Sequence, residues 1–157
     1  MKTRQFFLAL LVWLLASPGA YAAGSYLSHY TIKGSFEEVR DNVVFAINGR
    51  GYVINNVSHV GDMLERTGKD LGASKQIFVK AESLEFCSAT LSRRMMEADP
   101  HNIAFCPYII NIYVLPQDPK TVHISFRKPS LVGSAESKKS LKDVQVLLDE
   151  IIQEAIK

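Results

Sequence analysis

The chain contains only two cysteines, Cys87 and Cys106, and they are its most chemically informative residues. Three roles for them stay open. A disulfide between them would close a loop of about 20 residues and stabilise the fold by about 3 kcal/mol. Alternatively, they form a redox-active or ligand-binding thiol pair, because Cys87 lies where a strand meets the start of a helix, and a helix N-terminus lowers the pKa of a thiol. In the third role both are buried, unpaired, small apolar residues.

The position of the two sulfurs depends on residues 99–105, which precede Cys106. A plain parallel crossover between the strands that carry the cysteines would hold the two Cα atoms too far apart for a disulfide, which needs less than about 7 Å. Seven extended residues span about 20 Å, however, which is enough to return Cys106 to the end of the sheet where Cys87 lies. We therefore expect the pair at one end of the sheet, at the edge of a cleft. Four more residues are candidates to line that cleft: Ser88, Asp99, His101 and Pro107.

A metal site is considered because Met95, Met96 and His101 lie near the cysteines in sequence. Thiolate and thioether ligands would suit cuprous copper. No CxxC, HxxxH or MxxM spacing is present, and methionine at helical spacing is more often core filler. We predict no metal ligand and no cofactor. The remaining histidines occur singly in or beside predicted strands, where surface or satisfied core positions are expected; they are His29, His59 and His123.

Motifs for other kinds of catalysis are missing from the sequence. It has no GxSxG elbow and no HExxH pair, and its carboxylates are scattered along predicted helices. Gly49-x-Gly51 precedes a strand, whereas a dinucleotide site needs a glycine loop that opens a helix. We predict no catalytic residue, and the protein is more consistent with a binding module than with an enzyme.

The N-terminus has the pattern of a cleavable signal peptide over residues 1–22. Lys2 and Arg4 supply the positive region, an apolar run follows, and Ala20-Tyr21-Ala22 is a small-x-small cleavage site. Pro18-Gly19 interrupts the apolar run before the roughly 20 residues that a membrane-spanning helix needs. We expect a periplasmic or secreted protein with no stable membrane insertion after cleavage.

The mature part, from residue 23, has the length of one domain. The chain has 18 basic and 16 acidic residues, and the leader contains two of the basic ones, so 16 − 16 leaves a net charge near zero. A nucleic-acid-binding protein needs a basic excess, and none is present. Nucleic acid is therefore an unsuitable partner.

Hydrophobic spacing predicts an α+β fold, a two-layer sandwich with a mixed, mainly antiparallel sheet and helices packed on one face. Ser35 and Glu38 form a capping box before the first helix, and Ser88 caps another. The expected strands are 26–32, 52–60, 76–86, 108–115 and 121–127; the expected helices are 36–49, a short turn at 63–67, 89–98 and one from about 137. We assign 23–134 to the domain and 135–157 to a C-terminal amphipathic helix that packs on it.

Several of these motifs together resemble the family known as domain of unknown function 302, over about residues 51–129. They are the leading helix of residues 35–51 closed by glycine, the runs 84–89 and 96–100, Cys106-Pro107 with the strand after it, and the hairpin return that ends at Pro129. The resemblance implies an α+β domain that tends to form homodimers, with no established biochemical activity. An exposed sheet face, which a partner often covers, also favours a dimer.

Two functions remain at this stage. The first is a non-catalytic exported module that binds a small molecule or a protein, with Cys87 and Cys106 as a structural or site-lining pair. The second is a thiol-dependent redox or soft-metal-handling protein, in which Cys87 is the reactive sulfur and Cys106 resolves it.

Overall fold

Within residues 26–157, which the computed structural model describes, five strands form one sheet in the order β1-β5-β4-β3-β2. Every pairing between these neighbours is antiparallel. The strands are β1 (Leu27–Lys33), β2 (Ile54–Ser58), β3 (Lys80–Phe86), β4 (Tyr108–Val114) and β5 (Thr121–Arg127). The predicted signal peptide, residues 1–22, lies outside the described residues.

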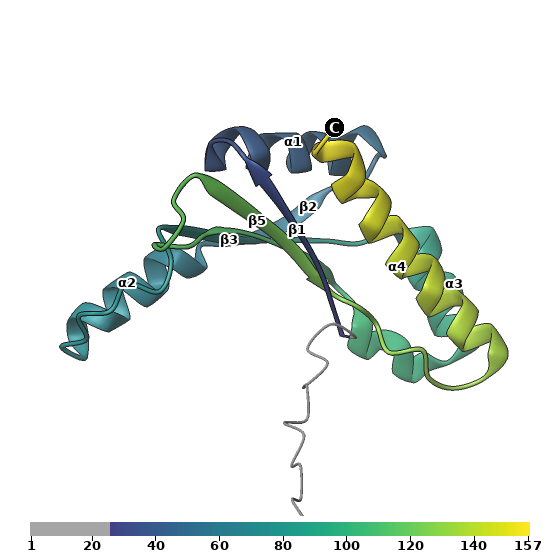
Figure 1. Cartoon of the computed structure of the whole chain (residues 1–157). Coiled ribbons are helices and arrows are strands. Elements are labelled where there is room, and N and C mark those ends of the chain that lie inside the picture. Colours follow the sequence, from purple (N-terminus) through teal and green to yellow (C-terminus); the bar gives the residue numbers. More distant parts are fainter. Residues whose placement is uncertain (1–25) are drawn as a thin grey trace, which may run out of the picture.

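Three helices pack on one face of this sheet (Figure 1). They are α1 (Phe36–Gly49), α3 (Ala89–Ala98) and α4 (Ala135–Ala155), and α4 contacts both of the others. The fourth, α2 (Val60–Asp70), projects from the sheet on the other side and contacts β3. The predicted α+β two-layer sandwich is confirmed, although the described sheet is entirely antiparallel and not mixed. No described helix combines the length and the apolar character that crossing a bilayer requires.

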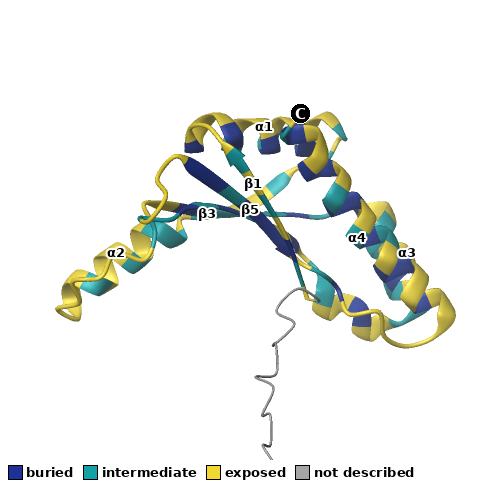
Figure 2. Cartoon of the chain, in the orientation of Figure 1, coloured by how far each residue is buried: buried dark blue, intermediate teal, exposed yellow. Residues whose placement is uncertain are grey.

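The hydrophobic core lies between the sheet and α1, α3 and α4. Alternate residues of β4 and β5 point into it, so that Ile110, Ile112 and Ile124 are fully buried while their sequence neighbours face the other side. The apolar stripe of α4 is buried along its whole length, as the spacing predicts, whereas α2 has no buried residue (Figure 2). The other face of the sheet, which these three helices leave open, is called the open face below.

Side-chain caps fix the starts of the helices that pack on the core. The Ser35 hydroxyl accepts a hydrogen bond from the backbone N–H of Glu38 at 3.2 Å, and the Ser88 hydroxyl accepts one from Leu91 at 3.4 Å. Ser134 does the same for α4. These bonds satisfy N–H groups that the helix itself leaves without partners. The predicted caps at Ser35 and Ser88 are confirmed; of the two bonds of the capping box, the one to the Ser35 hydroxyl is observed.

Some element boundaries differ from the prediction. β3 begins at Lys80 and not at residue 76, because Lys80 pairs with Val114, the last residue of β4. β2 is shorter than predicted, since it is an edge strand whose register shifts between Ile54 and Asn56. The expected turn at residues 63–67 is a helix of 11 residues, α2.

The segment between α3 and β4 is also different. We expected residues 99–105 to be extended, but a 3-10 helix, η1 (Pro100–Phe105), follows Asp99. The extended return is unnecessary, because β3 and β4 are antiparallel neighbours and the end of one already lies beside the start of the other.

Candidate functional site

The two cysteines meet at one end of the sheet. Their Sγ atoms are 3.1 Å apart and are not bonded. Cys87 follows the last residue of β3, Phe86, and Phe86 pairs with Tyr108, which starts β4 just after Cys106. The prediction of proximity is confirmed, although antiparallel pairing produces it and the extended return that we invoked does not. A disulfide has an S–S distance of about 2.05 Å, so an approach of about 1 Å would join the two sulfurs.

Cys106 also belongs to a small, partly buried polar cluster. The Ser92 hydroxyl lies 3.7 Å from the sulfur of Cys106 and 3.1 Å from the hydroxyl of Tyr108. Burial raises the pKa of Tyr108 to about 12. Burial, followed by the hydrogen bond with Cys106, raises the pKa of Cys87 to about 11. Both groups are therefore protonated at neutral pH, and the lowered thiol pKa expected from the helix N-terminus is not found.

A broad groove of about 830 Å³ opens beside Cys87. Three parts of the chain form its walls: the segment from the end of α1 into β2, the start of α3 with Cys87 before it, and the middle of α4. The apolar lining residues are Tyr52, Val53, Leu91, Val146 and Leu147, and the polar ones include Asn55 and Thr90. Val53 and Val146 are 71% and 43% exposed, so the groove presents apolar surface to solvent. This arrangement is called the Cys87 groove below.

Charged groups at the Cys87 groove are largely paired. Arg50 bonds Glu150 and Glu154 of α4 at 3.0 Å each, and Asp143 pairs with Lys139 at 3.0 Å. The first two pairs join the end of α1 to α4. The groove therefore favours a ligand with an apolar body and a few hydrogen-bonding groups over a highly charged one.

The other predicted site residues fall in different places. Ser88 lines the Cys87 groove beside Cys87. Pro107, joined to Cys106 by a cis peptide bond, lines a separate hollow of about 320 Å³. Asp99 and His101 lie past the other end of α3, about 15 Å along the helix from Ser88, where Asp99 caps η1 and the His101 side chain is 92% exposed.

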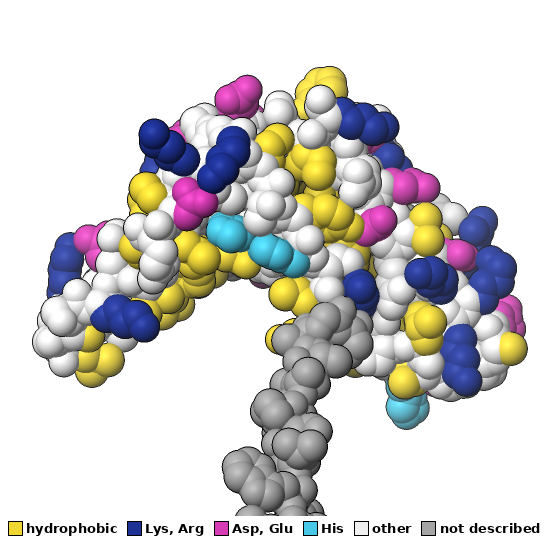
Figure 3. Space-filling view, in the orientation of Figure 1, with side chains coloured by type: hydrophobic (Ala, Val, Ile, Leu, Met, Phe, Trp, Pro, Cys, Tyr) yellow, Lys and Arg dark blue, Asp and Glu magenta, His cyan; other side chains and the backbone are white. Residues whose placement is uncertain are grey.

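The sequence interpretation missed a cluster of rings on the open face. His29 of β1 and His123 of β5 share a hydrogen bond of 3.0 Å between Nε2 and Nδ1. The ring of Tyr113 lies nearly parallel to that of His123 with centroids 5.0 Å apart, and the Phe78 ring meets Tyr113 edge-on. Histidine and apolar side chains gather in the hollowed side of the molecule (Figure 3). Strand pairing could have revealed the cluster, because His123 lies directly opposite both Tyr113 and Thr31, two residues from His29.

Charges near this cluster come from one exposed ion pair. Nζ of Lys33 and Oδ2 of Asp118 are 2.9 Å apart. Burial, followed by the proximity of His29, lowers the pKa of His123. The charge of Asp118 raises this pKa, and the charge of Lys33 lowers it. In the hydrogen bond between His29 and His123, one imidazole nitrogen therefore donates its proton, and the facing nitrogen of the other imidazole accepts it.

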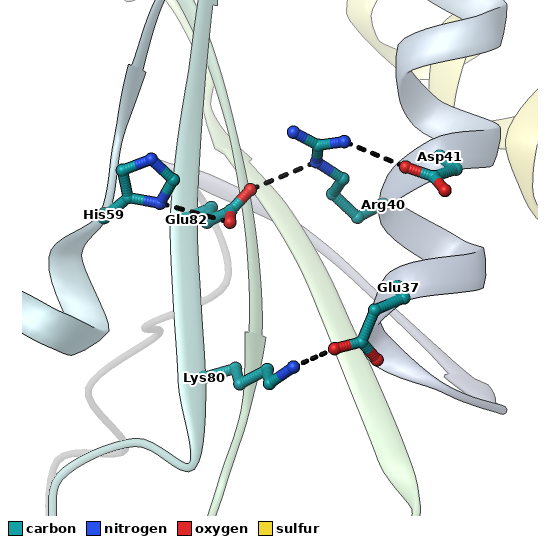
Figure 4. A network of polar contacts seen from close by, with 6 residues as sticks. All are labelled: Glu37, Arg40, Asp41, His59, Lys80 and Glu82. Atoms are coloured by element: carbon teal, nitrogen blue, oxygen red, sulfur yellow. Dashed lines mark hydrogen bonds and ion pairs between the residues drawn. The ribbon is translucent and has the colours of Figure 1, made fainter.

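A charged network links α1 to the sheet (Figure 4). The carboxylate of Glu82 accepts a hydrogen bond from Nε of Arg40 at 3.2 Å and lies 3.2 Å from Nδ1 of His59; Arg40 also bonds Asp41 at 2.9 Å. Lys80 pairs with Glu37 nearby. Every carboxylate drawn in this network has a cationic or imidazole partner. Because the Arg40–Glu82 and Glu37–Lys80 pairs join α1 to β3, the network holds this helix against that strand.

The described residues contain no ready-made cage for a metal ion. Among residues 26–157, no group of three or more histidine, cysteine, aspartate or glutamate side chains could hold a metal ion. Met95 is fully buried in the core, as methionine at helical spacing suggests.

Comparison with known proteins identifies the family. The model of the domain of unknown function DUF302 matches residues 28–156. The chain belongs to this family. The match includes β1, α1 and α4, so the family extends beyond the residues 51–129 on which the resemblance was based. No curated protein matches the chain significantly.

A solved structure shares the fold. It is described as the crystal structure of an uncharacterized conserved protein DUF302 from Bacillus stearothermophilus. It is 17% identical, has a TM-score of 0.69, and the alignment covers 83% of this chain and 98% of that chain. The DUF302 fold thus accounts for nearly the whole of the described structure.

Proposed function

We propose that this DUF302 protein is an exported, non-catalytic binding module whose ligand occupies the Cys87 groove. The observation that carries the proposal is the groove itself: about 830 Å³ of space, walled by three separate parts of the chain and open to solvent beside Cys87. Volumes of this size suit small organic ligands. We expect a small molecule whose apolar body packs against Val53, Val146 and Leu147. Its polar groups would form hydrogen bonds with Asn55 or Thr90.

The cysteine pair has a structural role in this proposal. Outside the cytoplasm thiols 3.1 Å apart are expected to oxidise to a disulfide. That bond would tie the start of α3 to the start of β4 and so fix one wall of the Cys87 groove. The raised pKa values of Cys87 and Tyr108 support a binding role, since both groups stay neutral at pH 7 and neither supplies a thiolate or phenolate at the groove.

The same 3.1 Å separation supports a second candidate, a thiol-dependent redox or soft-metal-handling protein. In that function Cys87 attacks a substrate disulfide as the thiolate, and Cys106 resolves the mixed disulfide. The raised pKa of Cys87 weighs against it, because little thiolate is present near pH 7. Incubation with glutathione buffers separates the two: a working pair exchanges near the compartment's redox poise, whereas a structural disulfide stays oxidised at more reducing potentials.

Native mass spectrometry of the protein purified from its own compartment tests the binding proposal. The wild type should retain an additional small-molecule mass, and Val146→Asp, which places a charge on the apolar wall, should lose it. Leu71→Asp is the matched control, because Leu71 is 77% exposed at the end of α2, away from the groove. A wild type with no bound mass, or a mass that Val146→Asp retains, would contradict the proposal.

Export and dimer formation are further parts of this proposal. Signal-peptide cleavage after Ala22 would give a mature protein that starts at Ala23, which N-terminal sequencing detects. Light scattering on the mature protein should give twice the monomer mass, and a monomer mass would contradict the proposed homodimer.

A further inference from the structure

We propose that His29 and His123 form a site for a divalent transition-metal ion with tetragonal geometry, Cu²⁺ above all, on the open face of the sheet. This site is independent of the Cys87 groove. His123 alternates along β5 with Val122 and Ile124, which are buried beneath the helices, so its ring faces the other side.

The distance between the two imidazole nitrogens fits one shared ion. Nε2 of His29 and Nδ1 of His123 are 3.0 Å apart. An ion about 2.0–2.1 Å from both nitrogens would subtend them at about 90°, the angle between adjacent ligands in square-planar and tetragonal coordination. A tetrahedral ion needs them about 3.3–3.4 Å apart, a slightly larger separation. Imidazole suits several divalent ions, and Cu²⁺ binds such ligands most tightly among them, so Cu²⁺ is the favoured ion.

The rings are already oriented toward each other. Their planes are nearly parallel, differing by 18°, their centroids are 5.1 Å apart, and the two facing nitrogens lie between them. A bound ion would displace the proton of this hydrogen bond and lie about 1.4 Å to the side of the line between the two nitrogens. A side chain held in place before binding loses little freedom when it coordinates, and that increases the affinity.

Neighbouring residues hold the pair in this geometry. The ring of Tyr113 stacks on His123, and Phe78 supports Tyr113 from its edge. Lys33 and Asp118 pair with each other, so the lysine charge that would repel a cation is offset. Because no third protein ligand is among the described residues, the remaining positions are left to water, and exchangeable binding is expected.

Pulsed electron paramagnetic resonance with Cu²⁺ alone as the probe tests the site, since it counts the imidazoles on the ion and does not count an amino terminus. The protein carries Cys87→Ser and Cys106→Ser, so that thiols neither bind nor reduce the ion. The expected count is two imidazoles, which falls to one in His29→Ala and in His123→Gln, with at least a tenfold loss of affinity for each. Circular dichroism verifies that both variants are folded.

The chain provides its own controls in its two other described histidines. His59 is paired with Glu82, and His101 is exposed far from the pair. His59→Ala and His101→Ala should keep the count of two and the affinity. A count below two in the Cys87→Ser/Cys106→Ser protein with all four histidines, or an equal loss in the control variants, would overturn the proposal.

Discussion

Oxidation of Cys87 and Cys106 should stabilise the fold measurably. The disulfide closes a loop of about 20 residues, for which the chain-entropy relation gives about 3 kcal/mol. The sulfurs start 3.1 Å apart, so closure needs a shift of about 1 Å and subtracts little from that gain. For a domain of about 130 residues the unfolding entropy converts 3 kcal/mol into a rise of about 10 °C in Tm.

Thermal unfolding followed by circular dichroism, with and without dithiothreitol, measures this difference. The oxidised wild type should unfold about 10 °C above the reduced wild type, and intact mass should show the loss of two hydrogens on oxidation. A Cys87→Ser/Cys106→Ser variant should not respond to the reductant. Equal midpoints for the oxidised and reduced wild type would refute the structural role of the pair.

Three further results are expected. Ile151→Ala should lower the free energy of unfolding by about 2–5 kcal/mol in urea titrations, since Ile151 is fully buried, whereas Val146→Ala on the same helix, at a partly exposed position, should cost much less. Asn102→Ala should cost about 1–3 kcal/mol in the same assay, because its buried amide bonds the Ser137 hydroxyl at 2.8 Å, and an unchanged midpoint would contradict this. In the reduced protein, the alkylation rate of Cys87 should keep rising with pH up to its pKa of about 11, and a plateau near pH 9 would refute the effect of burial.

Much of the fold could be predicted from the sequence because its strongest signals are local. The stripe of α4, the Ser35 and Ser88 caps and the hairpin of β4 and β5 all depend on residues close in sequence, and all appear as predicted. Strand ends were less accurate, since they depend on where the partner strand ends: β3 starts at Lys80 because β4 stops at Val114.

The candidate site was only partly predictable. The proximity of Cys87 and Cys106 follows from the antiparallel order of β3 and β4, which the sequence did not reveal. Asp99 and His101 were misplaced, because a helix of ten residues separates them from Ser88. The His29–His123 pair joins residues 94 positions apart and required the sheet order, since each histidine alone resembles a surface residue.

Hydrogen–deuterium exchange can locate the ligand directly. Protein purified with its ligand is compared with the same protein after the ligand is removed by unfolding and refolding. Binding in the Cys87 groove predicts slower exchange with ligand in residues 50–55, 87–91 and 143–150, and no change in β1 or β5. Slower exchange confined to β1 and β5, or identical exchange in the two samples, would contradict binding in the groove.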